Sequence, residues 1–257
     1  MALREVWHAR ELLYFLIWRD VKVRYKQTVL GIAWALVQPF LTMVIFTLLF
    51  GRLGRMPSDG MPYPLFSFSG LVPWTYFASA MGGGANSLAA SRYLIAKVYF
   101  PRLLVPLAAV LMPGIDMLIA LGMLIVLMVW YGVVPSVAIL LLPLLLVLLV
   151  MTALSIVLWT SALTVHYRDM RYLIPFAVQM LFFLTPVAYS GSTLPGQWRV
   201  LYGLNPMTTV VEGFRAVMVG GPPPGPMAFV SIAIVIIMFF TGVAYFRSVE
   251  SSIVDLI

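Results

Sequence analysis

Long apolar stretches free of ionisable side chains dominate the hydrophobic pattern of this chain. Six of them reach or approach the roughly 20 residues that a helix needs to cross about 30 Å of hydrocarbon. They lie at about Gly31–Phe50, Leu65–Ala90, Leu103–Trp130, Val133–Val165, Leu173–Ser190 and Met227–Phe246. The pattern therefore predicts an all-α integral membrane protein with six transmembrane helices.

Prolines such as Pro39, Pro113 and Pro143 lie inside these apolar runs. Proline removes a backbone donor, but neighbouring helices in a membrane bundle can satisfy the freed carbonyl groups. We therefore expect these prolines to kink their helices and not to end them.

The stretch from Gly191 to Pro226 does not follow the pattern of a simple span. Its apolar part, Val200–Val219, contains Glu212 and Arg215, and each charge costs roughly 2.5–3.5 kcal/mol at the bilayer centre. Turn-forming Pro and Gly residues flank it on both sides. A seventh full span is one interpretation, and a re-entrant helical hairpin between spans five and six is the one we favour.

The positions of the basic residues predict the orientation. With six spans, twelve Lys and Arg residues lie on the face that carries both termini and four lie on the other face. Cytoplasmic loops are the richer in Lys and Arg, so both termini are expected to be cytoplasmic. The net charge of +7 is better explained in this way than by a nucleic-acid partner, because 62% of the residues are hydrophobic and 10% are charged.

Residues 1–28 precede the first span and combine basic residues with aromatic and aliphatic ones. This mixture is typical of an amphipathic helix that lies in the headgroup plane, where cations reach lipid phosphates. A cytoplasmic helix packed on protein is the alternative.

Little reactive chemistry lies at bilayer depth. Asp116 is the one acidic residue within the six predicted spans, which contain no Lys, Arg or His. An enzyme or an ion-coupled carrier would need convergent titratable groups, so no catalytic or metal-binding residue is predicted. The sequence has no cysteine, and Gly82-Gly83-Gly84 is not followed by the Lys and Ser/Thr of a nucleotide-binding loop, so no cofactor is expected in this chain.

Two features leave alternatives open. Asp116 is either a functional carboxyl or a structural one, bonded to a helix end or to an Arg near the interface. The triplet Gly82-Gly83-Gly84 is either a surface for close helix packing or a ligand site.

Aromatic residues are abundant near the predicted membrane interfaces, and anchoring explains many of them. A second interpretation is a conduit wall, because flat aromatic faces offer contact area to sugar rings. The candidates for this wall are Trp34, Trp74, Tyr76, Phe77, Phe182 and Phe183.

The segment Ser91–Arg102 between spans two and three is both basic and apolar. Pro101 would end a helix before the next span, so the segment predicts a short helix that docks on a partner protein. An ordinary positive-inside loop would explain its basic residues, but it would not need exposed apolar ones. Those are Leu94, Ile95, Tyr99 and Phe100.

Several short motifs follow one another along the chain. They are Arg24-Tyr25 with Thr28-Val29-Leu30-Gly31 and Trp34 before Gln38-Pro39; Gly70-Leu71-Val72-Pro73-Trp74; Leu94 to Arg102; Tyr167-Arg168-Asp169; Phe182-Phe183-Leu184-Thr185-Pro186-Val187; and Asn205-Pro206-Met207 leading to Glu212 and Phe214-Arg215. In this order and spacing they resemble the transmembrane subunit of polysaccharide-exporting ABC transporters of the ABC-2 type. That family exports O-antigen, capsular polysaccharide and wall teichoic acid.

The resemblance implies one transmembrane domain over residues 1–257, with a cytoplasmic or interfacial helix at 1–28, a coupling segment at 91–102 and an outer re-entrant region at 191–226. It implies a homodimer in the bacterial cytoplasmic (inner) membrane, joined to two copies of a separate ATPase that binds ATP and Mg. The substrate would be an undecaprenyl-linked glycan. An ABC-2 subunit for a drug or a small lipid is the alternative.

The resemblance also implies roles for individual residues. ATPase docking would use Leu94, Ile95, Lys97, Tyr99, Phe100, Arg102, Arg168 and Asp169. Asn205, Glu212 and Arg215 would lie at the outer mouth. Arg24, Lys26 and Arg92 could attract the lipid pyrophosphate, although the positive-inside rule explains these three equally well.

Overall fold

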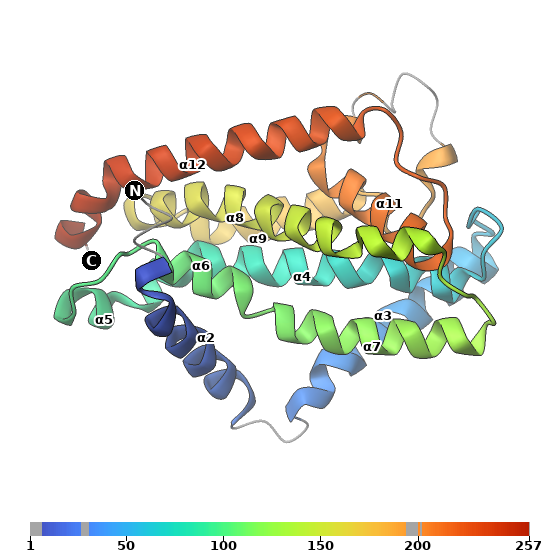
Figure 1. Ribbon diagram of the computed structural model, residues 1–257, viewed down its shortest axis with the longest axis horizontal. Coiled ribbons are helices and arrows are strands. Elements are labelled where there is room, and N and C mark those ends of the chain that lie inside the picture. Colours follow the sequence, from blue (N-terminus) through green and yellow to red (C-terminus); the bar gives the residue numbers. More distant parts are fainter. Residues whose placement is uncertain (1–6, 27–30, 194–199, 201, 257) are drawn as a thin grey trace.

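The computed structural model describes residues 7–26, 31–193, 200 and 202–256, and over these ranges the chain is a helical bundle without strands. The helices of eight or more residues are α2 (Arg10–Tyr25), α3 (Trp34–Phe46), α4 (Tyr63–Ala90), α6 (Leu104–Leu111), α7 (Gly114–Trp130), α8 (Leu142–His166), α9 (Met170–Phe183), α11 (Pro206–Val219) and α12 (Ala228–Leu256). The shorter elements are η1 (Gly31–Ala33), the π-helix η2 (Thr47–Leu53), α5 (Arg92–Lys97), η3 (Val137–Leu141) and η4 (Gly191–Thr193). In Figure 1, α4, α8 and α12 lie along the same long axis.

Four stretches are long and apolar enough to cross a membrane. They are Trp34–Leu53, Leu104–Trp130, Val137–His166 and Ala228–Glu250, which correspond to the predicted spans one, three, four and six. The predicted fifth span contains α9, which has only 14 residues, fewer than the roughly 17 that a spanning helix needs. The all-helical membrane class is therefore confirmed, whereas the number of six spans stays a prediction.

The predicted second span forms α4, the central helix of the bundle. It has 28 residues and contacts α3, α6, α7, α8, α9 and α11. Buried serines bond to its own backbone: Ser69 Oγ donates to Phe66 O at 2.9 Å and Ser87 Oγ donates to Gly84 O at 2.7 Å. Because its side chains face protein and its polar groups are paired, α4 does not need the apolarity of a helix surrounded by lipid.

One glycine of the triplet in α4 allows a close helix contact. A Cβ atom added to Gly84 would lie 2.6 Å from both γ-carbons of Val157 in α8, whereas nothing lies within 4 Å of the corresponding position at Gly82 or Gly83. The close-packing interpretation therefore holds at Gly84.

The prolines behave differently from one another. Pro39 lies inside α3, as predicted. However, α6 ends at Leu111 and α7 begins at Gly114, so Pro113 separates two helices (Figure 1). Pro143 lies in the first turn of α8, where the missing N–H has no intrahelical acceptor. The expectation of a kink without an end was wrong at Pro113, whereas at Pro143 the helical stretch of η3 and α8 continues without a gap.

The region before α12 contains the buried helix α11, which packs on α4, α8 and α12. Its 14 residues extend about 21 Å at 1.5 Å per residue, too short for a full span. Asn205 begins it by accepting a hydrogen bond from Met207 N at 3.0 Å, and Gly220 ends it with a φ of +75°. The first part of the predicted hairpin falls partly on residues 194–199 and 201, outside the described residues, so its re-entrant path stays a prediction.

Several segments that are distant in sequence meet at one end of the bundle. A hydrophobic cluster there combines Leu16 of α2, Ile95 of α5, Leu104 of α6, Leu158 of α8 and Phe246 of α12. Helix α2 begins at this end and α12 finishes there (Figure 1). We call it the α5 end and, without assigning either end to a side of the membrane, we call the opposite end, which carries the Gly220–Pro226 segment, the outer end.

Candidate substrate cavity and its flanking sites

A cavity of about 830 Å³ lies between α3, α4, α7 and α9, with the last turn of α2 at its edge. This volume lies in the range of about 300–1,000 Å³ that is typical of ligand sites. Trp34, Trp74, Tyr76 and Phe182 line it. The fold thus brings together four of the six aromatic residues predicted for a conduit wall.

The six aromatic candidates differ in burial. Trp34 is 52% exposed, whereas Trp74 is 5% exposed and packs 5.3 Å from the Phe182 ring, centroid to centroid. Phe77 is fully buried behind Trp74, and Phe183 is 61% exposed, so neither side chain is part of the cavity lining.

Tyr76 lines the cavity and also makes a hydrogen bond to a neighbouring helix. Its hydroxyl donates to the Val110 carbonyl at 2.9 Å and its side chain is buried. This bond fixes α4 against α6.

Uncharged polar side chains complete the lining. They are Gln38, Thr42, Thr75, Ser79 and Gln179. Gln38 in α3 and Gln179 in α9 are exposed in the single chain, and an amide that faces hydrocarbon without a partner is costly. This face of the bundle therefore suits an aqueous space or another protein surface better than lipid.

An ion pair lies at the edge of the cavity. Arg24 Nη2 and Asp116 Oδ2 are 2.9 Å apart, and the Tyr25 hydroxyl donates to Asp116 Oδ1. This contact supports the interpretation of Asp116 as a carboxyl paired with an Arg. Of the three basic residues predicted to attract a pyrophosphate, Arg24 alone lines this cavity, and Lys26 and Arg92 do not.

The α5 end carries the predicted docking segment. Ile95 and Phe100 are buried in the chain's own hydrophobic cluster. They therefore hold the segment on the bundle and are not exposed for contact with a partner protein. Tyr99 is 98% exposed, Lys97 is also exposed, and Leu94 is half-buried. A cavity of about 310 Å³ lies beside these residues.

Three charged docking candidates occupy the same end. Arg102 donates from Nη1 to the Glu250 carbonyl at 2.8 Å. Arg168 and Asp169 are exposed in the turn between α8 and α9. The outward-facing set is therefore smaller than the predicted one and consists of Lys97, Tyr99, Arg168 and Asp169.

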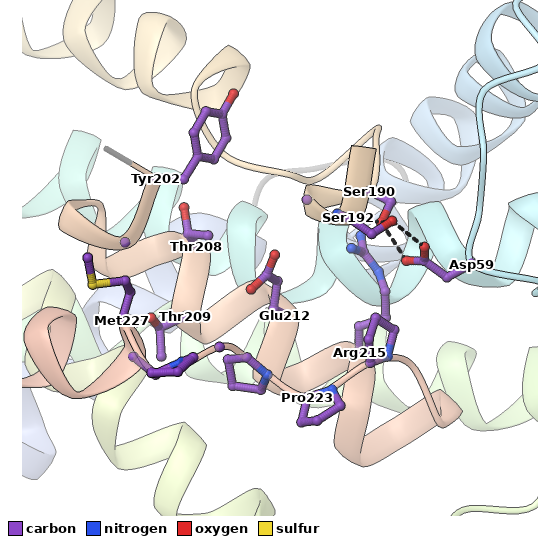
Figure 2. Close-up of a pocket in the computed structure, with 17 residues that line it drawn as sticks. Asp59, Ser190, Ser192, Tyr202, Thr208, Thr209, Glu212, Arg215, Pro223 and Met227 are labelled. Carbon is purple, nitrogen blue, oxygen red and sulfur yellow. Dashed lines mark hydrogen bonds between the residues drawn. The ribbon is translucent and has the colours of Figure 1, made fainter. Parts of the chain in front are cut away.

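A second polar pocket of about 270 Å³ lies at the outer end (Figure 2). Asp59 accepts hydrogen bonds there from Ser190 Oγ at 2.6 Å and from Ser192 Oγ at 2.8 Å. Of the three residues predicted for an outer mouth, Glu212 and Arg215 line this pocket and Asn205 does not. Asn205 instead caps α11 and donates to Thr185 Oγ1 at 2.9 Å.

Arg215 connects α11 to its neighbours and is only 2% exposed. Its Nη2 atom donates to the carbonyls of Pro186 and Val187 at 3.1 Å, and its guanidinium lies 3.6 Å from the Phe66 ring centroid. Burial lowers the pKa of Arg215 to about 10, while Glu212 and Asp59 act in the opposite direction. The guanidinium therefore stays charged at neutral pH and serves as a structural clamp.

A family model described as ABC-2 type transporter matches residues 11–219. The chain belongs to the ABC-2 type transporter family. It is 29% identical over 248 residues to the O-antigen export system permease protein RfbA of Myxococcus xanthus, covering 95% of each chain. It is also 27% identical to the RfbA protein of Klebsiella pneumoniae, over 91% of this chain and 87% of that protein. The polysialic acid transport protein KpsM of Escherichia coli is 22% identical over 91% of this chain and 92% of that protein.

Membership of the ABC-2 family fits the chemistry of the described residues. Among them, no group of three or more His, Cys, Asp or Glu residues could hold a metal ion. The polar groups that cluster in the described part of the chain include ion pairs and hydroxyl–carboxylate contacts.

Sequence reasoning missed three pairings. Asp59 is more than 130 residues from both Ser190 and Ser192 in the sequence. Arg102 and Glu250 are 148 residues apart. No local pattern marks contacts at such separations. The contact of Arg24 and Tyr25 with Asp116 was easier to anticipate from the sequence. A lone acidic residue at bilayer depth needs a partner, and these two donors lie just before the first span.

Proposed function

We propose that this chain is the membrane-channel subunit of an ATP-driven exporter that moves undecaprenyl-linked polysaccharide across the bacterial cytoplasmic (inner) membrane. The observation that carries the proposal is the combination of full-length similarity to O-antigen and polysialic acid transport proteins with a cavity walled by aromatic rings and uncharged polar groups. Such a wall contacts sugar rings without demanding one pattern of hydrogen bonds. It therefore suits a polymer of repeating units.

A second copy of the chain would complete the conduit. The exposed amides Gln38 and Gln179 lie on α3 and α9, which also carry exposed apolar side chains such as Leu41 and Phe176. A surface that combines these features is better covered by protein than by lipid. In a homodimer, the two cavities would face one passage through which the glycan moves.

The energy would come from two copies of a separate ATPase, which bind ATP and Mg. The α5 end offers a docking surface in which Tyr99 and Lys97 project and Ile95 and Phe100 hold the segment in place. Arg168 and Asp169 extend the surface with one charge of each sign. Movement of the ATPase would reach the bundle through this segment, residues 91–102.

The α5 end would face the cytoplasm together with both termini. Phe15 and Trp18 in α2 and Trp7 just before it are exposed beside basic residues, with Arg10 over the Trp7 ring at 5.5 Å. Aromatic rings and cations together suit the headgroup region of a bilayer. The outer end, with Glu212 and Arg215, would form the mouth through which the glycan leaves.

Depletion of the protein tests the proposal against export of a drug or a small lipid. Mass spectrometry of lipid extracts should show lipid-linked glycans accumulating inside depleted cells while surface glycan declines. An unchanged glycan pattern with retention of another compound would support the alternative. The control is a chromosomal copy of the wild-type gene under its own promoter, which should restore surface glycan.

A further inference from the structure

The ion pair between α2 and α7 lies at the edge of the cavity. Asp116 is near the middle of the 27-residue stretch Leu104–Trp130 and in the first turn of α7, while Arg24 is in the last turn of α2. A carboxylate at a helix start and a guanidinium at a helix end are both favourably placed with respect to the helix dipoles. The last turn of α2, which begins at the α5 end, is therefore bonded to the first turn of α7.

We propose that Arg24 is an anchor for a phosphate group of a lipid-borne diphosphate, and that Asp116 holds this anchor closed until the ligand displaces it. The proposal deepens the proposed function, because it assigns the chemical group of the substrate that the cavity receives first. We call the contact of Arg24 and Tyr25 with Asp116 the latch.

The difference in exposure between Arg24 and Asp116 favours exchange of the anion that is bound to Arg24. The Arg24 side chain is 43% exposed, whereas that of Asp116 is 17% exposed. Arg24 can therefore be reached from the cavity while Asp116 stays packed. A guanidinium binds phosphate and carboxylate with the same forked geometry, so one anion can replace the other without a new donor set.

The latch can open without leaving a bare charge. When a phosphate binds Arg24, Asp116 still accepts the hydrogen bond from the Tyr25 hydroxyl. It also stays in the first turn of α7, where the helix dipole favours a carboxylate. The phosphate gains neutral polar neighbours, since Gln38 and Gln179 line the same cavity. In the open state, the bound phosphate and the Asp116 carboxylate therefore both have polar partners.

The surroundings of Arg24 favour a ligand that arrives from the membrane. Phe15, Trp18 and Val23 on the same helix are exposed apolar side chains, which suit the boundary between headgroups and acyl chains. Trp34 offers an aromatic face in the same cavity for the first sugar next to the diphosphate.

Binding to the purified complex of the chain with its ATPase tests the latch. Native mass spectrometry would compare three probes: an undecaprenyl diphosphate, phosphatidylglycerol and inorganic diphosphate. The wild type should bind the polyprenyl diphosphate best. Asp116→Asn should bind it roughly three- to tenfold more tightly, because it frees a charge-assisted bond of Arg24. Arg24→Gln should lose most of the binding.

A matched pair on the same helix provides the control. Arg19 and Asp20 form an ion pair at 2.8 Å outside the cavity, so Asp20→Asn should bind like the wild type. Equal or weaker binding by Asp116→Asn, or unchanged binding by Arg24→Gln, would overturn the proposal. Equal binding of inorganic diphosphate would overturn the assignment to a lipid, and preference for phosphatidylglycerol would overturn the assignment to a diphosphate.

A second measurement keeps the test independent of the stability of Asp116→Asn. The chain has no cysteine, so spin labels at Val23→Cys and Leu118→Cys, both at exposed positions, report the separation of α2 and α7 within one chain when the labelled chain is diluted with unlabelled chain. The undecaprenyl diphosphate should shift their distance distribution to longer values, and an unchanged distribution would contradict the latch. If depletion left surface glycan normal while binding and opening persisted, the exporter proposal would fail and the latch would stand.

Discussion

Arg102 and Glu250 join the docking segment to the last helix. Arg102 donates through Nη1 to the Glu250 carbonyl at 2.8 Å, and its backbone N–H donates to Glu250 Oε1 at 3.3 Å. The segment after α5 is therefore bonded to α12, which packs along α8. A displacement of α5 can reach two long helices through this contact.

Arg102→Ala should reduce coupling more than stability. It removes one charged hydrogen bond to a carbonyl at a partly exposed site, a loss of about 1 kcal/mol. We expect the assembled complex to keep its basal ATPase rate and lose most of its glycan export. The control is Arg92→Ala, since Arg92 contacts the adjacent Tyr93 on the surface. Normal export with Arg102→Ala would exclude this route of coupling.

Tyr99 and Phe100 are neighbours with opposite expected effects. Tyr99 is 98% exposed and Phe100 is 8% exposed. Tyr99→Ala should leave thermal stability unchanged and weaken co-purification with the ATPase. Phe100→Ala should lower the free energy of unfolding by about 3 kcal/mol, as for other buried aromatic residues. Equal ATPase binding by Tyr99→Ala and the wild type would contradict a docking role for this segment.

The close contact of α4 and α8 gives a test of the packing. Gly84→Ala would place a methyl group 2.6 Å from the Val157 γ-carbons, so it should lower the thermal unfolding temperature in detergent. Gly83→Ala meets nothing within 4 Å and should be neutral or slightly stabilising, because alanine favours the helix. Equal destabilisation by both variants would contradict the close packing of Gly84 on Val157, because only Gly84→Ala meets the Val157 side chain.

The sequence predicted what depends on local composition. Four spans, the helical class and the family motifs follow from apolar length and residue order. The sequence was less informative where packing decides: α4 falls on a predicted span, but it is not among the four stretches that are apolar enough to cross a membrane, and it lies in the centre of the bundle. The same limit applies to the sites: an aromatic residue such as Phe77 looks like a wall residue in the sequence, but in the fold it is buried behind Trp74.

Trp34 provides the clearest test of the conduit wall. It lines the cavity and is 52% exposed, so Trp34→Ala should reduce export of surface glycan several-fold while thermal stability and ATPase docking stay normal. Trp74→Ala removes a ring that packs on both Phe77 and Phe182, so it should reduce export and also destabilise the bundle by about 3 kcal/mol or more. Glycan immunoblots and thermal unfolding of the two variants separate the effects. Normal surface glycan in both variants would contradict the aromatic wall, because neither the exposed Trp34 ring nor the buried Trp74 ring would then be needed for export of the polymer.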